Sequence, residues 1–241
     1  MRTLALSDEI LMKVDKAARY IGGEVNSVMK DKNEVDIRFA MCFPDVYEIG
    51  MSNLGMMILY NMFNQREDVW CERLFSPWPD LDKVMREEKI PLFALESQEA
   101  IRDFDFLGIT IGYEMCYTNI LQVLDLSGIP LKSADRGEDF PIVIGGGACA
   151  YNPEPLAPFF DLFYIGEGET VYDALFDAYK ANKKVGGSRK DFLLAAAKIP
   201  GIYVPSLYEV TYKEDGTIAS FAPTVDDVPE KVQKQLIIDM E

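Results

Sequence analysis

The 241-residue sequence contains no histidine, which narrows the chemistry that the chain can carry. Histidine is the usual general base near neutral pH, a common metal ligand and a member of the serine and cysteine catalytic triads. Histidine-dependent catalysis and histidine-based metal sites are therefore excluded for this chain.

Cysteines are few and scattered, at Cys42, Cys71, Cys116 and Cys149. No two of them form a CxxC motif and no three form CxxxCxxC, so the sequence encodes no local zinc or iron–sulfur site. Each lies in or beside an apolar run, where a free cysteine usually packs as a small buried hydrophobe.

The chain also lacks long apolar runs and clusters of basic residues. No run approaches the roughly 18 apolar residues of a membrane helix, and the opening MRTLALSDEILMKVD becomes acidic too early for a secretory signal. The 40 acidic residues outnumber the 24 basic ones and give a net charge of −16, which would repel a nucleic-acid backbone. We expect a cytoplasmic protein that binds neither nucleic acid nor membrane.

The most informative stretch is residues 141–170, which twice repeats a short apolar strand followed by glycines. Pro141 to Ile144 ends in Gly145-Gly146-Gly147, and Leu162 to Ile165 ends in Gly166-Glu167-Gly168-Glu169. Short apolar strands of this kind are typical of a parallel sheet covered on both faces. In such sheets the loops at the carboxyl ends of the strands form the ligand crevice.

The alternation of β and α patterns between residues 35 and 182 predicts an α/β fold. We expect a Rossmann-like, doubly wound sheet of five parallel strands in flavodoxin-like order. The strands are expected near residues 36–43, 69–75, 106–112, 141–145 and 162–165.

Three parts of the chain are distinguished. Residues 1–23 are expected to form a helix that begins after Ser7 and packs on the main domain, which is residues 24–182. Residues 189–241 are expected to form a small α+β appendage. In it, residues 191–198 are helical, residues 200–205 are extended and Asp215-Gly216 turns a hairpin.

Several loops at the carboxyl ends of the predicted strands carry the candidate cofactor-binding residues. They are Asp45, Tyr47, Gly50, Gly112, Tyr113, Gly145, Gly146, Gly147, Glu167, Gly168 and Glu169. Each has a structural alternative: Asp45 can cap a helix, Tyr47 can be a core ring, and the two glutamates can be first-turn acids. The same glutamates disfavour a phosphate or nucleotide site at the three consecutive glycines.

Two strand ends resemble a known family. The IGGG of Ile144 to Gly147 and the D-x-x-x-IGEGE of Asp161 to Glu169 resemble the N-terminal cobalamin-binding-like domain of the cobalamin-binding radical S-adenosylmethionine (SAM) proteins. Four further stretches resemble an uncharacterised fused subgroup of that superfamily: YIGGE at 20–24, FPDVYEIGMSNLG at 43–55, NPEPLAPFFD at 152–161 and PGIYVPS at 200–206.

The resemblance implies that cobalamin binds at the carboxyl ends of the strands without a histidine ligand. Cobalamin domains of the mutase type carry D-x-H-x-x-G, whereas this chain has Tyr47 at the histidine position. A neutral phenol is a poor metal ligand. We expect Asp45 and Tyr47 to shape the lower face of the cofactor.

The resemblance also implies a larger protein. S-adenosylmethionine and a 4Fe-4S cluster are expected in a C-terminal radical SAM domain of the same protein, because their CxxxCxxC motif is absent here. The chain alone is expected to catalyse nothing, and the full-length protein is expected to be a radical SAM enzyme. The alternative is a cofactor-free interaction domain that docks the catalytic barrel, with Tyr47, Tyr113 and Tyr151 filling the crevice.

Overall fold

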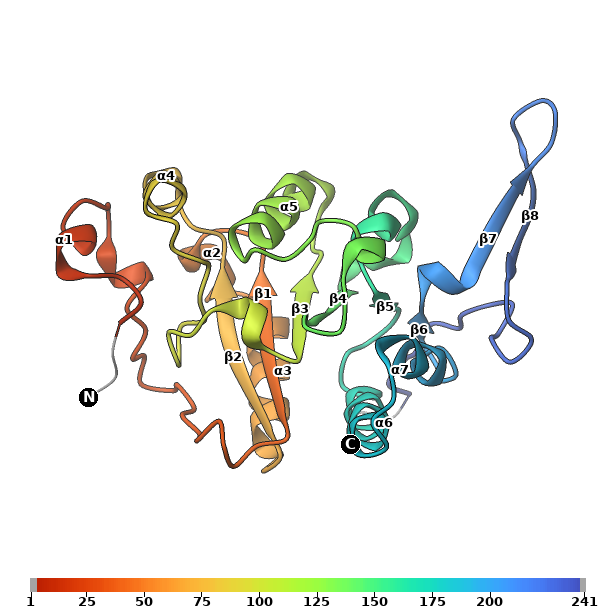
Figure 1. Ribbon diagram of the computed structural model, residues 1–241, viewed down its shortest axis with the longest axis horizontal. Coiled ribbons are helices and arrows are strands. Elements are labelled where there is room, and N and C mark those ends of the chain that lie inside the picture. The colour runs from red at the N-terminus through yellow and green to blue at the C-terminus, as the bar shows by residue number, and fades with distance from the viewer. Residues whose placement is uncertain (1–3, 239–241) are drawn as a thin grey trace.

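The computed structural model describes residues 4–238, which form a central six-stranded sheet with helices on both faces (Figure 1). The parallel strands are β1 (Ile37–Phe43), β2 (Val69–Phe75), β3 (Phe106–Thr110), β4 (Ile142–Gly146) and β5 (Leu162–Tyr164). Their order, β2-β1-β3-β4-β5, is the flavodoxin-like order expected from the sequence. Strands β1 and β2 are buried at every position, as parallel strands covered on both faces should be.

The sixth strand was not expected as part of this sheet. β6 (Ile202–Tyr203) pairs antiparallel with β5, so that Phe163 lies opposite Tyr203. The sequence predicts an extended segment here but assigns it to the appendage. The structure instead uses it to cover the β5 edge, and an edge strand left open would expose unpaired backbone groups.

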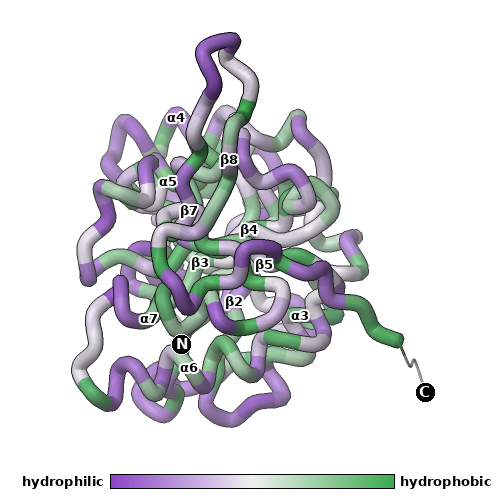
Figure 2. Tube along the Cα trace, turned by 90° about the vertical axis from the view of Figure 1, so that its right-hand side faces the viewer, coloured by the Kyte–Doolittle hydropathy of each residue, from purple (hydrophilic) through white to green (hydrophobic). Residues whose placement is uncertain are grey.

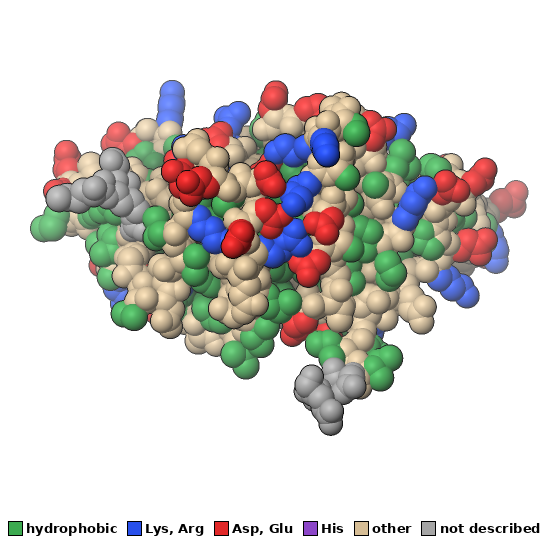
Figure 3. Space-filling model, turned by 90° about the horizontal axis from the view of Figure 1, so that it is seen from below, with side chains coloured by type: hydrophobic (Ala, Val, Ile, Leu, Met, Phe, Trp, Pro, Cys, Tyr) green, Lys and Arg blue, Asp and Glu red, His purple; other side chains and the backbone are tan. Residues whose placement is uncertain are grey.

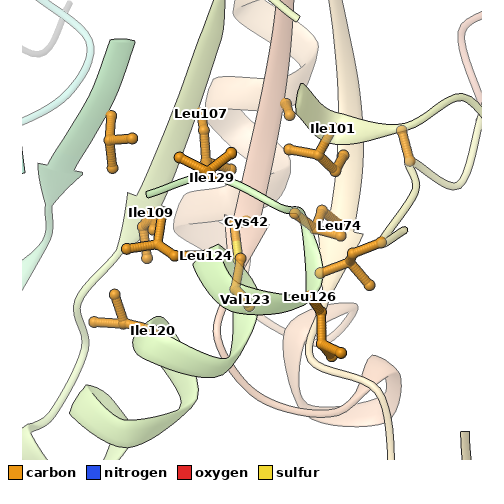
Figure 4. Close-up of a cluster of buried hydrophobic side chains, with 14 of the residues drawn as sticks. Cys42, Leu74, Ile101, Leu107, Ile109, Ile120, Val123, Leu124, Leu126 and Ile129 are labelled. Carbon is orange, nitrogen blue, oxygen red and sulfur yellow. The ribbon is translucent and has the colours of Figure 1, made fainter. Parts of the chain in front are cut away.

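Helices lie in two layers around the sheet. α4 (Pro79–Glu88) and α5 (Tyr117–Leu126) cover one face, where they bury the even-numbered side chains of β1. α3 (Leu54–Gln65), α6 (Tyr172–Lys184) and α7 (Arg189–Ala196) cover the other face. Figure 4 shows the first of these cores, where Ile120, Val123 and Leu124 of α5 pack towards Cys42, Leu107 and Ile109 of the sheet.

Short elements fill the connections. α2 (Tyr47–Gly50) is a single turn after β1. The 3-10 helices are Ala17–Arg19, Ile101–Asp103, Glu114–Cys116, Ser133–Asp135, Ala148–Tyr151, Glu154–Phe159 and Pro205–Leu207. Within residues 4–238, no helix combines the length and the apolar character needed to cross a bilayer.

The N-terminal helix is shorter than the sequence predicts. Ser7 caps it as expected, accepting a hydrogen bond from the Ile10 amide, but α1 covers only Asp8–Leu11. The chain then turns at Lys16, whose φ is 51°, because the Asp15 amide donates to the Asp80 carboxylate at 2.7 Å. This tertiary contact overrides the local helical pattern.

The C-terminal hairpin agrees with the sequence. β7 (Tyr208–Tyr212) and β8 (Ile218–Pro223) pair antiparallel, and Figure 1 shows them projecting from the body of the molecule. At the turn, Asp215 accepts a hydrogen bond from the Thr217 amide and Gly216 adopts a positive φ of 81°. An Asp-Gly turn of this kind is a strong hairpin signal.

Candidate functional site

A cavity of about 160 Å³ lies at the carboxyl ends of the strands, between the sheet and helices α3 and α6. Strands β1 and β3 both contribute to it, through Phe39 and Met41 and through residues 108–110. The strand order reverses between these two strands, and α/β folds bind ligands in the crevice at such a switch point. The cavity therefore lies where the fold is expected to hold a ligand.

Close packing of the strands shapes the floor of the cavity. A Cβ atom on Gly108 would lie 2.4 Å from the ring of Phe39, so glycine at this position lets the ring lie across β3. The same ring packs edge-to-face on Phe63 of α3 at 5.0 Å. The floor is consequently apolar and fixed by aromatic contacts.

Helix α3 supplies one wall of the cavity. Asn53 caps this helix by accepting a hydrogen bond from the Met56 amide at 2.9 Å, and Met56 and Leu59 line the cavity. Across from it, a Cβ atom on Gly168 would meet the end of Leu59 at 2.9 Å. The glycine loop after β5 is thus packed directly on α3.

Tyr172, at the start of α6, is the polar group of the cavity that the sequence did not reveal. Burial raises the pKa of its hydroxyl, so it remains a protonated donor at neutral pH. Its hydroxyl would lie 3.9 Å from a Cβ atom on Gly146 and has no hydrogen-bond partner in residues 4–238. A hydroxyl that lines a cavity and is not bonded to the protein is available to donate to a bound group.

The three consecutive glycines have different roles. Gly145 is packed inside β4, where a Cβ atom would lie 2.6 Å from the ring of Phe163. Gly146 lines the cavity and leaves open space where a side chain would be. Gly147 also lines it, with a φ of 99° and with room for no Cβ because the Ile111 carbonyl oxygen is 2.9 Å away. Only Gly146 combines an ordinary backbone with a free approach to the cavity.

Asp45, Gly112 and Tyr113 lie together on the loops that follow β1 and β3. The Tyr113 hydroxyl donates to the Asp45 carboxylate, and this hydrogen bond raises the pKa of Tyr113 to about 12. Gly112 is exposed, and a Cβ atom there would meet nothing within 4 Å. These residues form the rim of the crevice and not the wall of the cavity.

Tyr47 and Gly50 face a different part of the molecule. The Tyr47 hydroxyl donates to Glu24 at 3.0 Å and its ring packs on Phe75, and burial together with that carboxylate raises the pKa of Tyr47 to about 12. A Cβ atom on Gly50 would lie 2.1 Å from the same Phe75 ring. Tyr47 thus ties α2 to the N-terminal segment, and Gly50 lets α2 pack closely on β2.

The loop after β5 separates its two glutamates. Gly168 and Glu169 line the cavity. Glu167 is exposed, and its carboxylate accepts a hydrogen bond from the Ile237 amide at 2.5 Å. The structure thus brings together four of the eleven predicted residues at the cavity: Gly146, Gly147, Gly168 and Glu169.

The four cysteines are not gathered into a site. Cys42, Cys71 and Cys116 are buried and Cys149 is partly buried, and burial raises the pKa of the Cys116 and Cys149 thiols. Within residues 4–238, no three histidine, cysteine or carboxylate side chains are arranged to hold a metal ion.

Comparison with known proteins identifies the family. Residues 55–205 match the family described as "Radical SAM proteins, N-terminal", which is more than half of the chain. The chain belongs to this family. The matched range includes α3, the three glycines and the loop after β5, and so contains most of the cavity.

Two individual proteins are similar over smaller fractions of their length. An uncharacterised protein of Methanocaldococcus jannaschii, MJ0966, is 26% identical over 131 residues, which is 54% of this chain and 24% of that protein. The structure of the radical S-adenosylmethionine methyltransferase TsrM from Kitasatospora setae, with tryptophan and a SAM analogue bound, aligns with a TM-score of 0.40 and 14% identity. That alignment covers 74% of this chain and 29% of TsrM, and at this score nothing about the present chain follows from it.

Proposed function

We propose that this chain is the cofactor-binding domain of a radical SAM enzyme and that its cavity takes the nucleotide tail of cobalamin. The observation that carries the proposal is the cavity itself, which is apolar and lies beside three glycines at the β1–β3 switch point. The family gives the radical SAM context, and the motifs at residues 144–147 and 161–169 give the cobalamin expectation.

The residues present fit an aromatic base in three respects. An apolar cavity of about 150 Å³ is enough for one aromatic ring, and this one measures about 160 Å³. Gly146 leaves its edge open, and the Tyr172 hydroxyl lacks a partner among the described residues. Rings bind well in such sites when a few polar groups fix their orientation.

The corrin would be held at the rim, by the loops that carry Asp45, Gly112 and Tyr113. With no histidine in the chain and the Tyr47 hydroxyl bonded to Glu24, the domain would offer cobalt no histidine ligand. Cobalamin, when bound, supplies cobalt-centred chemistry that side chains cannot. The proposed role of this domain is to bind and orient it, while a C-terminal radical SAM domain holds S-adenosylmethionine and the 4Fe-4S cluster.

The test is titration of the purified chain with hydroxocobalamin and methylcobalamin, followed by absorbance and calorimetry. Gly146→Val should abolish binding, because the backbone tolerates valine in β4 while the side chain fills the cavity. Gly137→Val is the matched control, because a Cβ atom there meets nothing within 4 Å, one on Gly146 meets only the Tyr172 hydroxyl at 3.9 Å, and Gly137 lies outside the cavity. Both variants should keep the circular dichroism and melting temperature of the wild type.

Two results would overturn the cobalamin assignment. One is the absence of binding both to this chain and to the natural protein that carries it, and the other is unchanged binding in Gly146→Val. The enzyme context has its own test. Anaerobic reconstitution of that natural protein with iron and sulfide should give iron–sulfur absorbance, and its absence would contradict a radical SAM activity.

A second candidate is supported by exposed apolar side chains near the same loops. Leu54 is 72% exposed and Met115 is 86% exposed. A cofactor-free domain that docks the catalytic barrel would cover them. Failure of both cobalamins to bind, with retained binding to the barrel, would favour this candidate.

A further inference from the structure

The last described segment of the chain lies across the loop that follows β5. We call residues 232–237 the C-terminal strap. Gln235 pairs with Gly166 as an isolated parallel bridge, and Val232 packs against the core. In Figure 2 the strap leads to an apolar end that projects from the body of the molecule.

Several contacts fix the strap to the loops of the crevice. The Gln235 amide donates to the Ile165 carbonyl and the Glu167 amide donates to the Gln235 carbonyl, both at 3.1 Å. The Glu167 carboxylate then accepts from the Ile237 amide at 2.5 Å. On the neighbouring loop, the Lys234 ammonium lies 4.9 Å from the centroid of the Tyr151 ring. The strap thus contacts the loops that follow β4 and β5.

Two glycines make room for the strap. Gly166 has a φ of 143°, and a Cβ atom there would lie 2.5 Å from the carbonyl oxygen of Gln235. Gly201 has a φ of 81°, and its Cβ atom would lie 2.7 Å from the Gln235 side chain. Both positions require glycine for backbone conformation and for space, so the two glycines let the strap pack closely against the loop.

The loop that holds the strap is also a wall of the cavity. Gly166 lines the cavity and bridges Gln235, and Gly168 lines it two residues later. The Tyr164 hydroxyl, beside the cavity, donates to the Glu167 carbonyl at 2.5 Å. A displacement of the strap would therefore move residues that line the cavity.

We propose that Glu167 is a positioning residue: it clamps the C-terminal strap to the loop and so holds the cavity wall at Gly166 and Gly168. It acts through the strap and not by contact with the ligand, since its carboxylate faces Ile237. The alternative is an incidental surface hydrogen bond, which would leave the wall unchanged when it is removed. This proposal does not depend on which ligand the cavity takes.

The experiment is amide hydrogen exchange by NMR on the whole chain, without ligand. In Glu167→Ala, the Ile237 and Gln235 amides should exchange about tenfold faster, because a hydrogen bond to a charged acceptor is lost. Glu167→Gln keeps a neutral acceptor and should give a smaller increase. The methyl shifts of Leu59, whose side chain lies against Gly168 at the cavity wall, should move in Glu167→Ala, while the melting temperature stays near that of the wild type.

Glu169→Gln is the matched control, because it removes the same charge from the same loop at a carboxylate that accepts no hydrogen bond from residues 4–238. Its strap amides should exchange as in the wild type. Gln235→Pro tests the clamp from the strap side, since it deletes the donor to Ile165 without a substitution in the loop, and it should shift the amides of Gly166 and Gly168 and the methyl groups of Leu59. Unchanged exchange at Ile237 in Glu167→Ala, or a freed strap with unshifted Leu59 methyl groups, would overturn the proposal.

Discussion

The amino ends and the carboxyl ends of the parallel strands, which we call the amino edge and the carboxyl edge of the sheet, differ in the residues that form them. At the amino edge, Asp36, Asp68, Asp105 and Asp161 directly precede β1, β2, β3 and β5, and each contacts a lysine or arginine. At the carboxyl edge, glycines and apolar side chains surround a cavity with a free tyrosine hydroxyl. Figure 3 views the molecule from below, and it shows acidic and basic side chains mixed over the middle of the face that is visible in this view.

The aspartates of the amino edge complete the sheet as well as forming ion pairs. The Asp105 carboxylate accepts a hydrogen bond from the Arg38 amide at 2.8 Å, and the Asp161 carboxylate accepts one from the Val143 amide at 2.7 Å. These amides stand at the start of their strands, where the ladder offers them no partner. These amides and carboxylates satisfy one another, so we assign this edge to stability.

The carboxyl edge leaves its groups available. The Tyr172 hydroxyl has no partner in residues 4–238, and Gly146 presents bare backbone to the cavity. Such an edge contributes less to stability than a closed one, because unmade contacts are lost free energy. The difference supports the ligand site proposed at the carboxyl edge.

The strongest test of this contrast is at Asp161. Its carboxylate accepts hydrogen bonds from Arg136 at 2.9 Å and Arg189 at 2.7 Å, and the Arg136 side chain is fully buried. Asp161→Asn should lower the free energy of unfolding by about 3–5 kcal/mol, because buried charges lose their partner. Urea denaturation measures it. Asp173→Asn, an 82% exposed carboxylate that pairs with Arg66, should change it by less than about 0.5 kcal/mol.

Substitutions of Gly146 and Gly147, at the carboxyl edge, should give the next largest difference in stability. Gly147→Ala should destabilise the fold by about 1–3 kcal/mol, since φ is 99° and the new Cβ would meet the Ile111 carbonyl. Gly146→Ala should stay within about 0.5 kcal/mol, because its position is open. Thermal unfolding of the two variants checks this. Equal losses would mean that Gly146 is structural and that the edge is not open.

Most of the fold could be predicted because its signals are local. β1 and β5 are apolar runs that end at Pro44 and at Gly166, and the structure places both strands within two residues of the expected ranges. The hairpin turn at Asp215-Gly216 is likewise encoded in two residues. In each case one stretch of sequence determines the element.

What could not be predicted depends on partners distant in sequence. The early end of α1 follows from a contact between Asp15 and Asp80, and β6 is defined by pairing with β5. Tyr47 follows β1 as a site residue would, yet Glu24 and Phe75 hold it away from the cavity. Tyr172 was not predicted as a site residue, because an aromatic residue at the start of an amphipathic helix is usually part of the hydrophobic core. Its only signal was that it follows the IGEGE loop.

The stability that the amino edge contributes should depend on pH, and this dependence gives a further test of the comparison between the two edges. Hydrogen bonding to the Arg66 guanidinium holds the pKa of Asp68 well below its ordinary value. Because the folded pKa is lowered, its stabilisation is present above the unfolded pKa of about 3.9 and is lost as pH falls through the folded pKa. Asp68→Asn should cost about 1–2 kcal/mol at pH 7.

The loss relative to the wild type should shrink below about pH 4, because the Asp68 carboxylate of the unfolded wild type takes up a proton there while that of the folded protein, whose pKa is lower, stays ionised. Urea denaturation of both proteins at pH 7, 4 and 3 provides the measurement. A difference that stays constant down to pH 3 would show that the charge of Asp68 is not what stabilises this edge.

The smallest changes in stability are expected for Tyr47→Phe and Tyr172→Phe. This matched pair separates a structural role from a role in ligand binding most directly. Tyr47→Phe deletes a hydroxyl that donates to Glu24, so it should lower the free energy of unfolding by about 1 kcal/mol and leave hydroxocobalamin affinity within about twofold. Tyr172→Phe deletes a hydroxyl without a partner in residues 4–238, so the free energy of unfolding should be unchanged or slightly higher. Its hydroxocobalamin affinity should fall about five- to tenfold, because the free donor at the cavity is lost. Calorimetric titration beside thermal unfolding reads both quantities, and a Tyr172→Phe variant that loses stability but keeps its affinity would place this hydroxyl with the structural groups.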